Sequence, residues 1–342
     1  MRNGDLLILK GQEVRKLLAG REAELIDIVR AAYLAHADGD SSLPHSTFLR
    51  FPADSESRII ALPAYLGQDF GVAGIKWISS FPRNLQQQLE RASAVVVLNS
   101  LQTGRPEALI EGSIISAKRT AASAALAARS LQNGHRASSA SLIGCGLINF
   151  EIARFILAAC PEVRRFYVYD LDAERARWFG AKCRELAEGI ECEVVGDWRE
   201  AFRSSRLVSL ATTASVPHIP DLSDCQPGTV VLHISLRDIA PEAILECDNV
   251  VDDVDHVCRA QTSVHLAEQL SGNRDFIRCT LADVLTGRAA PRRDAEGVTV
   301  FSPFGVGVLD LAVASCTRDY GLTQNCGTVI SSFLPDTWIE RE

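Results

Sequence analysis

The spacing of apolar residues along the chain changes near residue 137. From 13 to 38 they recur at helical spacing, which predicts two helices or one helix broken near Gly20. Farther along, they form short strand-like runs separated by Pro and Gly, at 47–51, 58–62, 72–78 and 94–98. We therefore expect a first domain of α+β type with a mostly antiparallel sheet.

Beyond residue 137, strand-like and helix-like segments alternate until about residue 252. The expected strands are 140–143, 166–169, 206–211, 228–234 and 248–251, and the expected helices include 147–158, 173–187 and 197–203. Such alternation is typical of α/β domains with a doubly wound parallel sheet, in which ligands bind at the carboxyl ends of the strands.

The first turn of this alternation carries a glycine pattern. Gly144 allows a tight turn, and Gly146 lets the backbone approach a pyrophosphate. The amides of Leu147 and Ile148 start the next helix and attract negative charge. Asn149 replaces the third glycine of the usual pattern. Together these features predict a dinucleotide-binding βαβ unit of the Rossmann type; a glycine turn in some other α/β protein is the alternative.

The nature of the dinucleotide depends on Asp170, which ends the next strand, 26 residues after Gly144. A carboxylate there accepts hydrogen bonds from the adenine ribose hydroxyls and repels a 2′-phosphate. Arg175 and Arg177 lie near enough in sequence to suit a 2′-phosphate instead. We predict NAD as the cofactor.

Composition narrows the class of ligand. The 342 residues are 47% hydrophobic and carry a net charge of −8, which excludes nucleic acid and anionic membranes as main partners and favours a small molecule. No apolar run approaches the ~20 residues of a membrane span, and the first residues lack the apolar core of a signal peptide, so we expect a cytoplasmic protein. The ten cysteines contain no C-x-x-C pair, and no metal site is predicted.

Three cations interrupt the apolar runs of the first domain: Arg50, Lys76 and Arg119. Lys76 stands in the middle of a strand, and Arg119 opens an expected helix at 120–130. A buried charge without a partner is unstable. Each cation therefore needs either a neighbouring Asp or Glu, or a substrate carboxylate, and both interpretations stay open.

Polar residues also follow the strands of the second domain, where the crevice is expected. Thr212 and Thr213 end one strand and could contact the cofactor or simply cap the strand. Asp238 follows another strand, where burial would raise the pKa of its carboxyl towards neutrality and suit it to acid–base catalysis. The alternative for Asp238 is the N-cap of a helix starting at Pro241.

Several separated segments together resemble the ornithine cyclodeaminase/μ-crystallin family. They occur in the family's order over nearly the whole chain, at 74–82, 98–106, 115–127, 143–146 and 298–312. Three further segments resemble one branch of the family, the N-(2-amino-2-carboxyethyl)-L-glutamate dehydrogenases, which make 2,3-diaminopropionate for siderophores such as staphyloferrin B and for some antibiotics. These segments are 43–52, 91–99 and 235–242.

This resemblance implies roles for individual residues. Arg50, Lys76 and Arg119 would bind substrate carboxylates, with Arg119 clamping the α-carboxylate, and Asp238 would be catalytic together with Lys76. Ser93 would contact the cofactor. The family commonly has a Lys near Ser302, which this chain lacks.

The resemblance also implies a domain arrangement and a reaction. Residues 1–118 and 318–342 would form a substrate-binding and dimerisation domain of a homodimer, and residues 119–317 the NAD domain. The expected reaction is the NAD-dependent oxidative hydrolysis of an amino-acid conjugate to 2,3-diaminopropionate and 2-oxoglutarate. Ornithine cyclodeaminase, a ketimine or opine-type reductase and a non-catalytic ligand binder are the alternatives.

Overall fold

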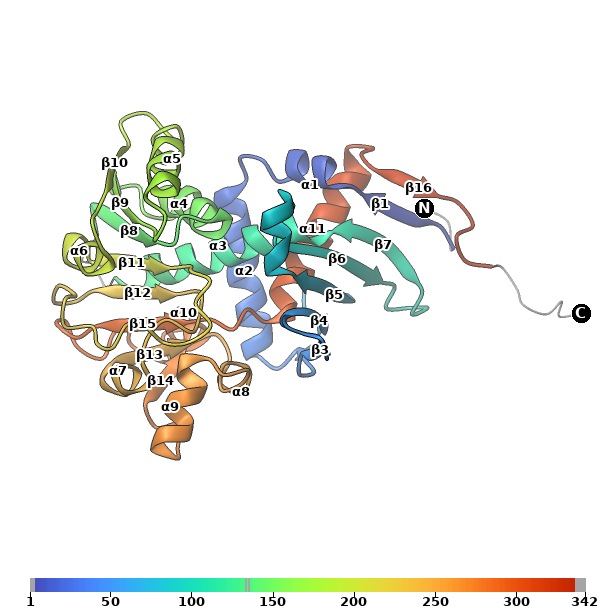
Figure 1. Cartoon of the computed structure of the whole chain (residues 1–342). Helices are drawn as coiled ribbons and strands as arrows, with labels where there is room; N and C mark the ends of the chain where they lie inside the picture. The colour runs from blue at the N-terminus through green and yellow to red at the C-terminus, as the bar shows by residue number, and fades with distance from the viewer. Residues whose placement is uncertain (1–3, 133, 135, 336–342) are drawn as a thin grey trace, which may run out of the picture. The chain divides into compact units, whose positions relative to one another are not determined.

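The computed structural model describes residues 4–132, 134 and 136–335, and it divides into two compact units (Figure 1). Unit 1 comprises the chain up to Arg21, the segment Ala35–Arg119 and the chain from Val306 onward. Unit 2 comprises Glu22–Leu34 and Thr120–Gly305. Two long helices, α2 (Glu22–Ala37) and α3 (Gly112–Leu131), each begin in one unit and end in the other.

Unit 1 is built on an eight-stranded sheet. Its neighbouring strands pair antiparallel, with the exception of one parallel pair. The order begins at β16 (Thr328–Ile330) and continues through β1 (Leu6–Leu9), β7 (Pro106–Glu111), β6 (Ala92–Asn99), β5 (Val72–Ser80), β4 (Asp54–Leu66) and β2 (Ser41–Ser42), while β3 (Thr47–Phe51) also pairs with β4. The parallel pair is β1 with β7. The predicted antiparallel sheet is confirmed.

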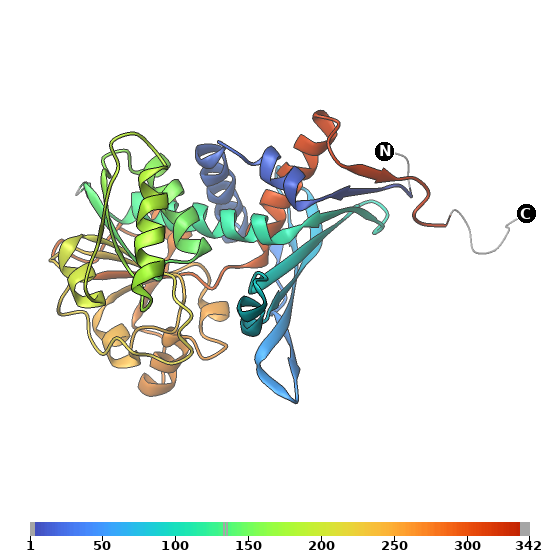
Figure 2. The same ribbon diagram turned by 45° about the horizontal axis from the view of Figure 1, so that its top comes forward.

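The two faces of this sheet differ. Helix α11 (Gly307–Thr323) packs against β4, β5 and β6 (Figure 2). Side chains alternate between the faces of a strand, so Lys76 is buried with its cross-strand partners Leu62 and Val96, whereas the next residue, Trp77, is exposed. The smaller helices of this unit are α1 (Gly11–Leu17) and the 3₁₀ helix η1 (Pro82–Gln87).

Unit 2 contains an eight-stranded sheet in which every pair of neighbours is parallel. Figure 1 shows the strands in the order β10 (Glu191–Val194), β9 (Arg165–Tyr169), β8 (Ser139–Ile143), β11 (Leu207–Leu210), β12 (Val230–His233), β15 (Thr299–Ser302), β13 (Asp248–Val251) and β14 (Ile277–Thr280). All residues of β11, β12, β13 and β15 are buried. Helices therefore cover both faces of the centre of the sheet, as parallel sheets require, and the predicted Rossmann-type α/β class is confirmed.

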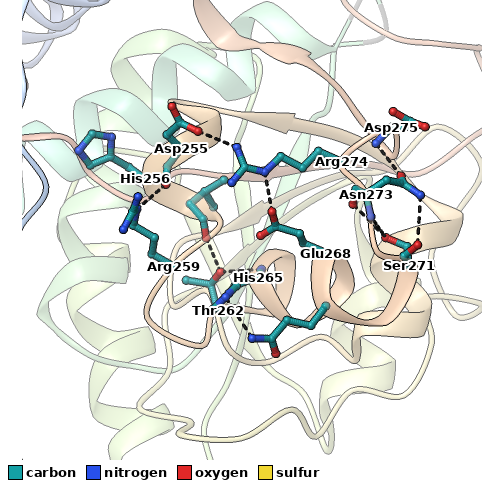
Figure 3. Close-up of polar contacts among 12 residues, drawn as sticks. Asp255, His256, Arg259, Thr262, His265, Glu268, Ser271, Asn273, Arg274 and Asp275 are labelled. Carbon is teal, nitrogen blue, oxygen red and sulfur yellow. Dashed lines mark hydrogen bonds and ion pairs between the residues drawn. The ribbon is translucent and has the colours of Figure 1, made fainter.

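The helices of unit 2 follow its strands along the chain. They are α4 (Leu147–Ala159), α5 (Ala173–Arg184), α6 (Trp198–Ser204), α7 (Pro241–Glu246), α8 (Val254–Val257), α9 (Ser263–Ser271) and α10 (Leu281–Leu285). Figure 3 shows how α8 and α9 are tied together: Arg274 binds Asp255 at 2.6 Å and Glu268 at 2.7 Å. Thr262 caps α9 by accepting a hydrogen bond from the His265 amide at 3.0 Å.

Several boundaries differ from those expected from the sequence. Glu22–Leu34, expected in the first domain, belongs to unit 2. Helix α3 begins at Gly112, not at residue 120, because the Glu111 carboxylate accepts hydrogen bonds from the amides of Ser113 and Ile114 at the start of the helix. Arg119 therefore lies inside α3. The second unit ends at Gly305 rather than at residue 317, so the whole of α11 belongs to unit 1.

No helix in the described part of the chain is long and apolar enough to cross a membrane. The ten cysteines are free thiols.

Candidate active site

The glycine turn of unit 2 has the geometry of a nucleotide-binding loop. Gly144 has φ of +92°, and a Cβ there would lie 2.6 Å from the carbonyl oxygen of Ala211, so no other residue fits. Gly146, at the N-cap of α4, has extended backbone, and a Cβ built on it meets nothing within 4 Å. The amides of Leu147 and Ile148, in the first turn of α4, are thus reachable by a pyrophosphate placed over Gly146.

Asn149 explains why the third glycine is dispensable. Its side chain is fully buried, and its Nδ2 donates to the carbonyls of Ile143 at 2.9 Å and Gly144 at 2.8 Å. The Ser209 hydroxyl in turn donates to its Oδ1 at 2.7 Å. Asn149 therefore ties α4 to the turn and to β11 by hydrogen bonds, where the usual glycine allows close packing of helix and strand.

Asp170, at the end of β9, lies beside the same turn. One carboxylate oxygen accepts a hydrogen bond from the Cys145 amide at 2.7 Å, and the other accepts one from the Asp172 amide at 3.0 Å. Arg175 donates a hydrogen bond from Nε to the Cys145 carbonyl at 2.8 Å, so this arginine also stabilises the turn. Arg177 pairs with Glu174 within helix α5. Each carboxylate oxygen keeps a further lone pair for a ribose hydroxyl.

The strand order of this sheet reverses direction between β8 and β11, which is the position at which α/β sheets bind a nucleotide. The chain leaves β11 at Leu210, and Thr212 follows in contact distance of the Gly144 turn. The Thr212 hydroxyl donates to the Asp238 carboxylate and accepts a hydrogen bond from the Ala214 amide at 3.1 Å. Thr212 thus connects the nucleotide crevice to Asp238, whereas Thr213 is exposed beside it.

Asp238 is fully buried and held by several donors. Burial raises the pKa of this carboxyl, but the contact with His233 and the hydroxyls of Ser235 and Thr212 outweigh burial and lower the pKa to about 2. The expectation of a pKa near neutrality was wrong because folding turns the side chains of His233, Ser235 and Thr212 towards the carboxylate, and burial alone was considered. Asp238 is not the N-cap of α7 either, since that helix begins at Pro241 with Ala240 as its cap.

His233 supports the backbone of Asp238. Its Nε2 accepts a hydrogen bond from the Asp238 amide at 3.2 Å, and its Nδ1 lies 3.2 Å from the Ser302 hydroxyl. The contact of Nε2 with the Asp238 carboxylate, at 3.4 Å, becomes an ion pair when the ring is protonated.

Unit 1 holds the second group of candidate residues. Lys76 and Arg119 are buried and share one carboxylate, Asp310 on α11: Lys76 Nζ lies 2.7 Å from one oxygen, and Arg119 Nε lies 3.0 Å from the other. Burial, together with the charge of Arg119, lowers the pKa of Lys76 to about 8 against the opposing effect of Asp310. Two cations with one carboxylate leave one positive charge, which suits a substrate carboxylate.

Arg50 and Ser93 are not brought into this group. Arg50 lies exposed on β3, with its guanidinium 5.6 Å from the centre of the Phe48 ring, so the premise of a buried cation was wrong for Arg50. Ser93 is exposed on β6, and its hydroxyl lies 2.8 Å from the Ser79 hydroxyl. By strand alternation Ser93 shares the outer face of the sheet with Trp77, opposite the face that carries Lys76.

Sequence reasoning missed Asp310 and His233. Asp310 is an acid within an almost wholly apolar and buried stretch of α11, and such a residue signals a buried cationic partner. His233 ends a strand of buried apolar residues, which signals a satisfied core histidine or a site residue. Within the described residues, no group of three His, Cys, Asp or Glu side chains is placed to hold a metal ion.

Comparisons with known proteins show the family to which the chain is similar. The model of the ornithine cyclodeaminase/mu-crystallin family matches residues 7–325. The N-((2S)-2-amino-2-carboxyethyl)-L-glutamate dehydrogenase of Staphylococcus aureus is 28% identical over 338 residues, covering 97% of this chain and 100% of that protein.

Two solved structures have the same fold over nearly their whole length. The Thermococcus litoralis Δ1-pyrroline-2-carboxylate reductase, in complex with NADH and L-proline, has a TM-score of 0.85 and 26% identity and covers 94% of this chain and 99% of that chain. An archaeal alanine dehydrogenase dimer with bound NAD has a TM-score of 0.84 and 26% identity and covers 96% of this chain and 99% of that chain. With a family model matched along almost the entire sequence, the chain belongs to the ornithine cyclodeaminase/mu-crystallin family.

Proposed function

We propose that this protein is an NAD-dependent dehydrogenase that oxidatively hydrolyses N-(2-amino-2-carboxyethyl)-L-glutamate. The substrate, NAD⁺ and water give 2,3-diaminopropionate, 2-oxoglutarate, NADH and a proton. The protein is an oxidoreductase of its family, acting on the CH–NH bond of an amino acid with NAD as cofactor. The choice of substrate is supported by the S. aureus dehydrogenase, to which the chain is similar over its whole length.

The observation that carries the proposal is the link from the glycine turn through Thr212 to Asp238. Through Thr212, the glycine turn expected to bind the nucleotide lies close to the buried, ionised carboxylate of Asp238, and both follow strands of the same sheet. Asp170 suits NAD because its carboxylate accepts hydroxyl hydrogen bonds and repels a 2′-phosphate. When bound, NAD accepts the hydride that leaves the glutamate Cα of the substrate.

Asp238 is proposed to transfer a proton from the attacking water to the departing amine. The low pKa of this carboxyl keeps it ionised at neutral pH, which is the form that accepts a proton from the water attacking the substrate imine. The departing amine is a far stronger base than a carboxylate, so passing the proton to it is downhill and completes cleavage of the C–N bond. Thr212 and Ser235 hold the carboxylate in place.

The cations of unit 1 bind the substrate's carboxylates. The substrate carries three, and Arg50, Lys76 and Arg119 are proposed to bind carboxylates of the substrate, with Lys76 and Arg119 sharing one of them. Arg119 donates a hydrogen bond from Nε to Asp310. Its two terminal nitrogens suit a bidentate hydrogen bond to the α-carboxylate. Lys76 adds a positive charge that holds a carboxylate and polarises the attacking water.

The test is an absorbance assay for NADH. The protein is incubated with NAD and the glutamate conjugate, with ornithine in parallel, and the products are identified by mass spectrometry. We expect net NADH equal to the 2-oxoglutarate formed, and no proline from ornithine. Proline and ammonia from ornithine without net NADH would make the protein a cyclodeaminase, and oxidation of NADH by a cyclic imine would make it a reductase. If the protein binds a ligand but turns over neither the glutamate conjugate, ornithine nor the cyclic imine, it is a non-catalytic ligand-binding protein.

The outer face of the unit 1 sheet supports a homodimer. Trp77 and Val95 are cross-strand partners and are 42% and 38% exposed, and Leu49 on the same face is 46% exposed. Adjacent exposed apolar side chains of this kind mark an interface, and the archaeal alanine dehydrogenase to which the chain is similar is a dimer. Light scattering should give twice the chain mass, and Trp77→Glu should give the monomer mass. A monomeric wild type would contradict the assignment.

The product points to a biosynthetic role. 2,3-Diaminopropionate is a building block for siderophores and antibiotics, and we place its formation in the cytoplasm, where NAD and glutamate-derived substrates are available. Deleting the gene should create a growth requirement for 2,3-diaminopropionate wherever such a product is needed.

A further inference from the structure

Asp310 is a buried acid to which no part of the reaction has been assigned. It lies on α11, is fully buried, and reaches Lys76 from β5 and Arg119 from α3. The residues beside it along the helix, Leu309 and Leu311, are buried and apolar. An isolated carboxylate there would be unstable, so the two cations and Asp310 depend on one another.

The charges around Lys76 define what Asp310 does. The charged groups that act on Lys76 are Asp310 and Arg119, while its cross-strand neighbours, Leu62 on β4 and Val96 on β6, are apolar. Ser116 on α3 adds a hydroxyl 3.3 Å from Nζ. Without Asp310, burial and the repulsion from Arg119 would together favour the neutral amine of Lys76.

We propose that Asp310 is a positioning residue that keeps Lys76 protonated and fixes the guanidinium of Arg119 through Nε, so that the pair receives one substrate carboxylate. The inference rests on the proposed function in that this carboxylate belongs to the amino-acid substrate. A second acid beside Lys76, Arg119 and Asp310 would neutralise the net positive charge of this group, which would then no longer attract a carboxylate. Without any acid, Lys76 would lose its charge. One acid shared by two cations leaves the single positive charge that the ligand needs.

The experiment follows the titration of Lys76 by NMR in the full-length protein labelled with ¹³C,¹⁵N-lysine. The sequence has five lysines, so the spectrum is simple, and Lys76→Met identifies the signal of interest. In Asp310→Asn we expect Lys76 to titrate about one to three pH units lower than in the wild type. The matched control is Asp319→Asn, the same change at an exposed position of α11, and it should leave the titration unchanged.

Activity provides a second measurement. In Asp310→Asn, the fall of kcat/KM towards high pH should move to lower pH together with the Lys76 titration, and 2-oxoglutarate, a product with two carboxylates, should bind about tenfold more weakly at neutral pH. In the Lys76→Met background, Asp310→Asn should no longer change the pH profile. A merely structural defect would lower activity equally at every pH.

The outcomes separate this inference from the proposed function, because the titration requires no substrate. An unchanged Lys76 titration in Asp310→Asn overturns the inference even if the glutamate conjugate is oxidised. A shifted titration without oxidation of the conjugate supports the inference and overturns the proposed substrate. If Asp310→Asn does not fold, Asp310→Glu decides: a retained wild-type titration supports the role of the carboxylate, and a lowered one overturns it.

Discussion

The Asp238→Asn substitution tests the proposed chemistry most directly. The amide has the shape of the carboxylate but cannot accept a proton in the neutral range. It can still accept one of the two hydroxyl bonds from Thr212 and Ser235, and its NH₂ group can donate to the oxygen of the other hydroxyl. We therefore expect a folded protein with NAD affinity within about threefold of the wild type and turnover lowered by ~10² or more, equivalent to about 2.7 kcal/mol.

The lowered pKa of Asp238 adds a stability signature to this variant. A depressed pKa stabilises the fold above the ordinary value of 3.8, and the stabilisation is lost as pH falls through the folded value of about 2. The difference corresponds to about 2 kcal/mol for this fully buried group. Asp238→Asn should therefore be less stable than the wild type at neutral pH, and the gap should narrow at acidic pH.

The measurements are steady-state NADH formation, calorimetric titration with NAD and chemical unfolding over a range of pH. Asp221→Asn is the control, because Asp221 also accepts hydrogen bonds from a serine, Ser223, but lies exposed in a loop. The control should match the wild type in turnover and in NAD affinity. Near-normal turnover of Asp238→Asn would refute the acid–base role and direct the search to Lys76.

Three further outcomes follow from the same geometry. Side-by-side titration should favour NAD over NADP by ~10²-fold or more because of Asp170, and equal affinities would remove Asp170 from the ribose site. Arg119→Lys should lower kcat/KM by about 10- to 100-fold, or ~1.5 to 3 kcal/mol, with NAD affinity unchanged, because an ammonium loses the bidentate geometry; early melting with normal kinetics would instead make Arg119 an internal ion-pair partner. Because burial lowers the pKa of Lys76 to about 8, KM should rise as pH increases through about 8 and Lys76 loses its proton; a flat KM there would contradict a charged Lys76.

The sequence by itself determined the architecture and the nucleotide turn. Residues close along the chain decide these features: apolar periodicity defines each strand and helix, Gly144 is required by a local backbone angle, and Asp170 is placed by the length of one βαβ unit. The cations Lys76 and Arg119 were also recognisable, because a charge within an apolar run needs a partner.

Only the tertiary structure decided which partner each group has. Asp310 lies 234 residues from Lys76 and 191 from Arg119, and no local pattern predicts that α11 places its carboxylate between them. The pKa of Asp238 likewise depends on the contacts with His233, Ser235 and Thr212 that folding creates, and its direction was predicted wrongly from burial alone. Periodicity measures burial, but the charge state of a buried group is decided by the donors and charges that folding brings to it.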